Sequence, residues 1–66
     1  MSRYDYQQSA DIDKRDYPFY ALIMAAMRRA DTDNLRKLQA AWPDVWDELD
    51  MRYNAPGGRL PDDGDG

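Results

Sequence analysis

The side chains that could do chemistry in this 66-residue chain are carboxylates and hydroxyls, because the sequence contains no cysteine and no histidine. The absence of cysteine excludes disulfides, thiol nucleophiles and cysteine-based zinc sites. The absence of histidine excludes an imidazole base and an imidazole ligand for a metal. Most of the reactions that small enzymes catalyse need one of these groups, so the composition favours a protein that works by binding.

Two acidic segments resemble a metal-binding loop but lack its other parts. Asp11 and Asp13 are spaced as at the start of a calcium loop, yet Lys14 and Arg15 follow them. The glycine that the turn needs and the bidentate glutamate are both missing. The Asp-Asp-Gly-Asp-Gly run at 62–66 is typical of a flexible acidic terminus. We therefore expect no metal site.

Two further pairs of residues fail as parts of an active site. Gly57 and Gly58 lack the lysine and the serine or threonine of a phosphate-binding loop. Asp44 and Glu48 are four residues apart on one expected helix face, but an exposed face does not prepare a carboxyl group for acid–base catalysis. We expect no catalytic residue and no cofactor, and hence no enzyme.

The strongest helix signal covers residues 17–30. It begins with Asp16, which can cap a helix, and with Pro18, which is tolerated in a first turn. Its other sides are also apolar except for Arg28 and Arg29, so this helix needs cover on more than one side. Apolar residues with the spacing of one helical face stand at Phe19, Leu22, Ile23, Ala26, Met27 and Ala30.

Two shorter helices are expected at 33–41 and 43–53. The Asp-Thr-Asp-Asn run at 31–34 stops the first helix and caps the second, because short polar side chains compete with the helical backbone and cap helix starts. The second helix ends before Pro43, which itself takes the favoured first position of the third. Asn54, followed by Ala-Pro-Gly-Gly, ends the third helix.

The predicted fold is all-α, with a small three-helix domain at 17–54. A polar N-terminal arm at 1–16 shows no sustained helical period, and the acidic C-terminal tail at 55–66 is expected to be disordered. So small a core predicts marginal stability, to which a partner or a second copy would add. The expected core consists of Phe19, Leu22, Ile23, Ala26, Met27, Leu35, Leu38, Trp42, Val45, Trp46, Leu49 and Tyr53.

The net charge of −4 is concentrated in the last third of the chain. Residues 43–54 carry four acids against one base, and residues 55–66 carry three aspartates against one arginine. Residues 18–42 are mildly basic, with four bases against two acids. The third helix stands where a helix-turn-helix protein has its recognition helix, and DNA phosphates would repel it. We therefore expect no direct binding to nucleic acid.

Two surfaces could bind a protein. One is an apolar stripe on the first helix, whose methionine and tyrosine suit an adaptable interface, unless tyrosines of the arm cover it. The other is the acidic face of the third helix, which could occupy a basic groove made for nucleic acid or could serve solubility alone. The predicted partner-binding residues are Tyr20, Met24, Asp44, Asp47, Glu48 and Asp50.

Four segments within residues 17–60 resemble those of a known group of proteins. They are Ala-Leu-Ile-Met-Ala-Ala-Met at 21–27, Asp-Thr-Asp-Asn-Leu at 31–35, Trp-Pro-Asp-Val-Trp at 42–46 and Arg-Tyr-Asn-Ala-Pro-Gly-Gly at 52–58. Together they resemble small orphan proteins encoded by bacteriophages and prophage-like elements. The resemblance implies no catalytic residue. It implies a context in which small acidic helical proteins often inhibit host machinery, as anti-CRISPR proteins and nucleic-acid mimics do.

The predicted function is that of a non-enzymatic phage-type protein that inhibits or modulates a bacterial host protein, such as one that handles nucleic acid. The longest apolar run of the chain, residues 19–27, is too short for a signal peptide or a bilayer span. We therefore expect a cytoplasmic location in a bacterial host and no membrane partner. The first alternative is a structural protein that forms a homo-oligomer through the Tyr20 and Met24 side. The second is a small DNA-binding regulator.

Overall fold

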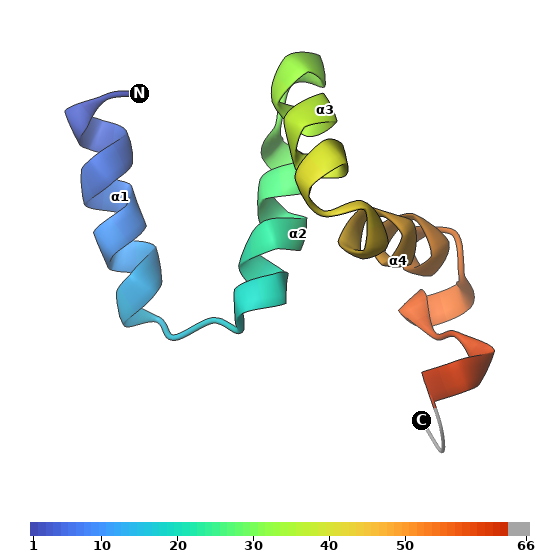
Figure 1. The fold of residues 1–66 in the computed structure, drawn as a ribbon. Helices are drawn as coiled ribbons and strands as arrows, with labels where there is room; N and C mark the ends of the chain where they lie inside the picture. The colour runs from blue at the N-terminus through green and yellow to red at the C-terminus, as the bar shows by residue number, and fades with distance from the viewer. Residues whose placement is uncertain (64–66) are drawn as a thin grey trace.

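A computed structural model describes residues 1–63, which form helices joined by short turns (Figure 1). Four α-helices are followed by two 3₁₀ turns, in the order α1 (Arg3–Lys14), α2 (Phe19–Arg29), α3 (Thr32–Ala41), α4 (Pro43–Tyr53), η1 (Pro56–Gly58) and η2 (Pro61–Asp63). The all-α prediction is confirmed. The helices expected at 17–30, 33–41 and 43–53 correspond to α2, α3 and α4. The expected cap at Asp16 is wrong, because Pro18 is the N-cap of α2 and no side chain caps that helix.

The prediction of an arm without helical structure at 1–16 is wrong, because α1 occupies most of that segment. Ser2 and Asp5 form a reciprocal capping box, in which each side chain accepts a hydrogen bond of 3.1 Å from the backbone N–H of the other. Asp16 follows the helix in a left-handed conformation, with φ of 56°. The local Ser-x-x-Asp motif was therefore a better guide to this helix than hydrophobic periodicity.

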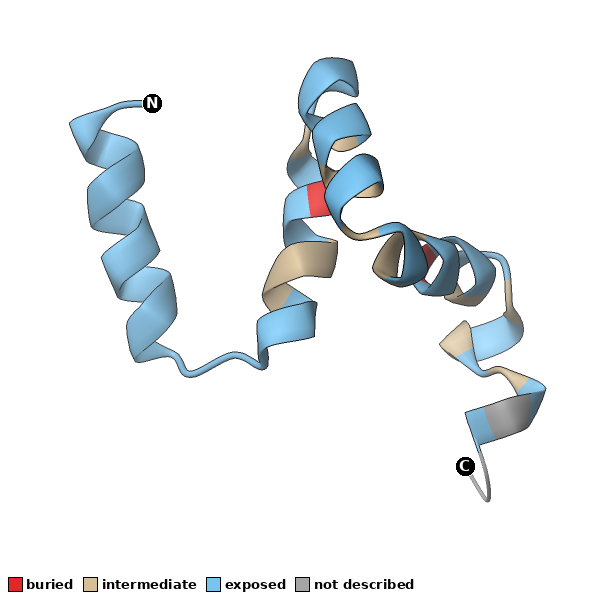
Figure 2. Cartoon of the chain, viewed as in Figure 1, coloured by how far each residue is buried: buried red, intermediate tan, exposed pale blue. Residues whose placement is uncertain are grey.

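Helices α2, α3 and α4 pack against one another around a small core (Figure 2). Met27 of α2 and Leu49 of α4 are the buried side chains of the described chain, with 3% and 6% of their surfaces exposed. The expected core was wrong for Phe19, Ala26 and Tyr53, which are exposed. The others are at least half-buried, namely Leu22, Ile23, Met27, Leu35, Leu38, Trp42, Val45, Trp46 and Leu49.

Three aromatic rings join the start of α2 to the junction between α3 and α4. Phe19 lies 5.3 Å from Tyr20 and 5.5 Å from Trp42, and Tyr20 lies 6.1 Å from Trp42, measured between ring centroids. All three pairs meet edge to face, the arrangement that the quadrupoles of aromatic rings favour. This cluster holds the exposed end of α2 against the junction.

The prediction of disorder at 55–66 is wrong for the part that the structure describes, and residues 64–66 lie outside it. Arg52 of α4 donates a 2.8 Å hydrogen bond to the carbonyl oxygen of Gly58. It also donates to both carboxylate oxygens of Asp63, at 2.8 and 2.6 Å. Gly57 has a φ of 61°, which lets the chain turn back towards α4. Residues 55–63 are therefore attached to α4 through one arginine.

Replacing Arg52 by glutamine is expected to release this segment. The hydrogen bonds from Arg52, together with one from the backbone N–H of Leu60, hold the pKa of Asp63 at about 2, against an ordinary value of 3.8. Because the folded-state pKa is the lower one, the attachment contributes stability above pH 3.8 and loses it as the pH falls through about 2. NMR titration of the Asp63 carboxyl should show a pKa near 2 in the wild type and a higher pKa, closer to 3.8, in Arg52→Gln. An unchanged titration in the variant would contradict the assignment.

Candidate protein-binding surface

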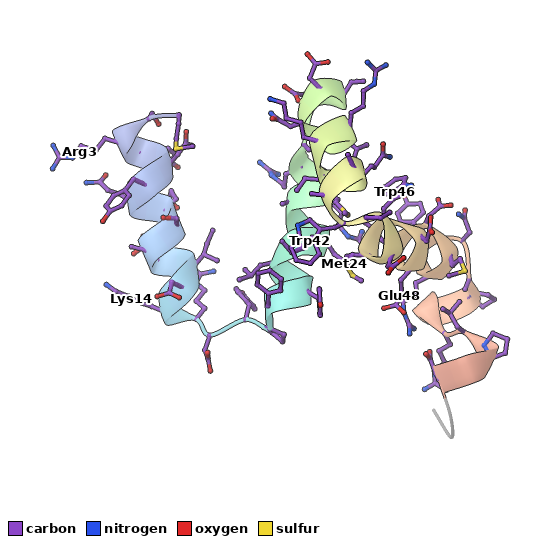
Figure 3. The ribbon with its side chains drawn as sticks, in the orientation of Figure 1. Arg3, Lys14, Met24, Trp42, Trp46 and Glu48 are labelled. Carbon is purple, nitrogen blue, oxygen red and sulfur yellow. The ribbon has the colours of Figure 1, made fainter. Side chains whose placement is uncertain are left out.

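Four of the six predicted binding residues line one shallow groove between α2 and α4. Tyr20 and Met24 come from α2, Asp44 and Glu48 come from α4, and Val45 completes the lining of a hollow of about 230 Å³. Figure 3 shows Met24 and Glu48 close together where the two helices meet. The apolar stripe and the acidic face, which the sequence analysis treated as separate surfaces, thus share this α2–α4 groove.

The other two predicted residues lie outside the α2–α4 groove. Asp47 is exposed on α4. Asp50 lines a different hollow, together with Met27 and Leu49, and its Oδ1 accepts a 3.4 Å hydrogen bond from Asn54. Since Asp47 and Asp50 do not adjoin Tyr20 and Met24, the six residues do not form one continuous site.

The two carboxylates of the groove are both available to an incoming cation. Glu48 lies 3.8 Å from Nε of Arg52, measured from its Oε2 atom, and this exposed contact is long for an ion pair. Asp44 makes no salt bridge within residues 1–63. Apolar surface next to two lightly engaged carboxylates is suited to a side chain that combines an aliphatic stem with a positive charge.

The stripe on α2 is not covered by α1. No Cα atom of α1 lies within 8 Å of a Cα atom of another described helix. Tyr4 and Tyr6 of α1 are 67% and 74% exposed, and Tyr20 is 55% exposed. Met24 is half-buried against α4, whereas Ala21 is exposed towards α1. The apolar surface of α2 is therefore divided between two opposite sides of the helix.

Sequence reasoning missed two contacts that arginine side chains make with residues on or near α4. Arg28 places its guanidinium 5.7 Å from the centroid of the Tyr53 ring, a cation–π contact. Arg52 holds Asp63 across eleven positions of the chain. Helical spacing could have indicated the contact of Arg52 with Glu48, but no local signal connects Arg52 to Asp63.

Within residues 1–63 no three acidic side chains gather closely enough to hold a metal ion. None of the helices in that range is long and apolar enough to cross a bilayer.

No protein-family model matches this chain, and no curated protein or solved structure is significantly similar to it.

Proposed function

We propose that this chain is a non-enzymatic binding protein that modulates a bacterial host protein through the α2–α4 groove. The observation that supports this function best is the meeting of Tyr20 and Met24 with Asp44 and Glu48 in one hollow. An apolar anchor beside carboxylates is a common arrangement for binding a protein segment, because burial supplies affinity and charge supplies selectivity. The resemblance to small phage proteins adds the setting, a phage protein acting in the host cytoplasm.

The chemistry of the groove specifies a partner segment with a basic residue next to an apolar one. A lysine or arginine stem can lie along Met24 and Tyr20 while its charge meets Asp44 and Glu48. Surfaces that bind nucleic acid are rich in such basic residues. The proposed partner is therefore a nucleic-acid-handling protein of the host, and nucleic acid itself would be repelled by the same carboxylates.

Charge reversal within the groove tests this function. A partner is first captured from bacterial lysate, identified by mass spectrometry and purified, and its affinity is then measured by calorimetry at several salt concentrations. Asp44→Lys combined with Glu48→Lys is expected to weaken binding at least about 100-fold, because an attraction becomes a repulsion within the interface. The salt dependence of the affinity should fall as well.

The matched control is Asp11→Lys combined with Asp13→Lys, which makes the same change of charge on α1. This control should bind within about threefold of the wild type, since Asp11 and Asp13 do not line the α2–α4 groove and exposed charges outside a binding site contribute little to affinity. Equal losses in the two double variants would show that net charge alone matters. An unchanged affinity in the groove variant would refute the proposed function.

A further inference from the structure

Another hollow lies on the opposite side of α2 from the α2–α4 groove. Its lining is apolar and comes from α1, the α1–α2 turn and α2, and its volume is about 540 Å³. The apolar lining residues are Ile12, Tyr17, Ala21, Leu22, Ala25 and Ala26. Arg29 provides the remaining lining side chain, so an occupant would meet a single charge. We refer to this hollow and the exposed side of α1 as the α1–α2 face.

Helix α1 lacks the packing that a helix of its length needs. It has 12 residues, none of them buried. Helices of this length are marginal in water without tertiary contacts, because few hydrogen bonds offset the cost of starting the helix. Ile12 and Tyr17 remain 41% and 50% exposed beside the hollow. The capping box of Ser2 favours α1 but does not replace an apolar contact.

The chain also exposes far more surface than a compact globular protein of the same mass. Its accessible surface is 5842 Å². A globular protein of 7.7 kDa is expected to expose about 4300 Å². The radius of gyration is 13.9 Å, against about 11 Å expected for 66 residues. The excess, about 1500 Å² per chain, is spread over the whole chain and is larger than the area of about 800 Å² that each partner buries in an interface of standard size.

We propose that the α1–α2 face binds a second copy of this chain, with the two faces packed together about a two-fold axis. In a symmetric dimer, each chain contributes one apolar hollow and one helix α1 that has no tertiary contacts of its own. Each α1 can then gain from the other chain the apolar contact that it lacks. Ala21 and Ala25 leave space for a partner helix to approach α2 closely. The dimer uses the side of α2 away from Tyr20 and Met24, so it does not depend on the proposed function.

The test is the mass in solution of three proteins, measured by sedimentation equilibrium from low to several hundred micromolar. The wild type should approach twice the 7.7 kDa of one chain as concentration rises. Ala25→Arg places a charge inside the α1–α2 face and should weaken dimerisation at least about 100-fold, since a symmetric dimer contains the substitution twice. Ala40→Arg, at an exposed alanine of α3, is the matched control and should dimerise like the wild type.

Far-UV circular dichroism of the same samples provides a second measurement. The helix content of the wild type should rise with concentration, because α1 is stabilised by the second copy. Ala25 is exposed, so the variant should keep the helix content of a dilute wild-type sample. A wild type that stays monomeric at every concentration would overturn the proposal. So would a dimer that Ala25→Arg leaves intact, or one that Ala40→Arg weakens equally, because each would place the interface elsewhere.

Discussion

Replacing Met27 by alanine is expected to unfold the packed part of the chain, which consists of α2, α3 and α4. Met27 is 3% exposed and, with Leu49, forms the buried centre of the described residues. Shortening a buried methionine to alanine costs about 2–5 kcal/mol, from lost burial and from the cavity that remains. A single core in a chain of this size rarely supplies more than about 3–5 kcal/mol. The substitution therefore removes most of the stability.

Thermal unfolding followed by circular dichroism measures this effect at a fixed protein concentration. The variant should lose its cooperative transition, while Met51→Ala provides the matched control. Met51 lies in α4 and is 53% exposed, so its truncation should change stability by less than about 0.5 kcal/mol. A wild-type transition in Met27→Ala would show that the α2–α4 packing does not depend on this side chain.

Replacing Trp42 by alanine is expected to have the second-largest effect. The substitution removes two edge-to-face contacts, at 5.5 Å to Phe19 and 6.1 Å to Tyr20. Each such pair contributes about 0.5–1.5 kcal/mol beyond the burial of the ring. Because Trp42 is half-buried, we expect a total loss of about 3 kcal/mol, near the lower limit for a large aromatic residue.

Trp42→Phe is the conservative control, because it keeps an aromatic ring at the junction of α3 and α4. It should retain more than half of the stability that Trp42→Ala loses, as measured by denaturant unfolding. Trp42→Ala should also move the NMR signals of the Tyr20 ring, since that ring loses the contact that holds it beside the α2–α4 groove. Equal stability of the alanine variant and the wild type would contradict this role.

The helices that the sequence predicted well are those with strong signals within four residues. The capping role of the 31–34 run is confirmed, since Asp31 accepts a 2.8 Å hydrogen bond from the backbone N–H of Asn34. Pro43 begins α4 as expected. α1 was missed although Ser2 and Asp5 form an equally local motif, because its apolar residues have little helical period. A capping box does not depend on apolar residues, and α1 is the most polar of the four α-helices.

The sequence by itself determined that α2 exists and where α3 and α4 begin and end, and it excluded cysteine and histidine chemistry. Helix limits follow from caps and prolines, which act on the backbone within one turn. Only the tertiary structure decided which sides of α2 are covered, that Met24 and Glu48 line one hollow, and that Arg52 holds Asp63. These contacts depend on the angles between helices, which are set by the packing of side chains distant in sequence. No spacing rule within one helix contains that information.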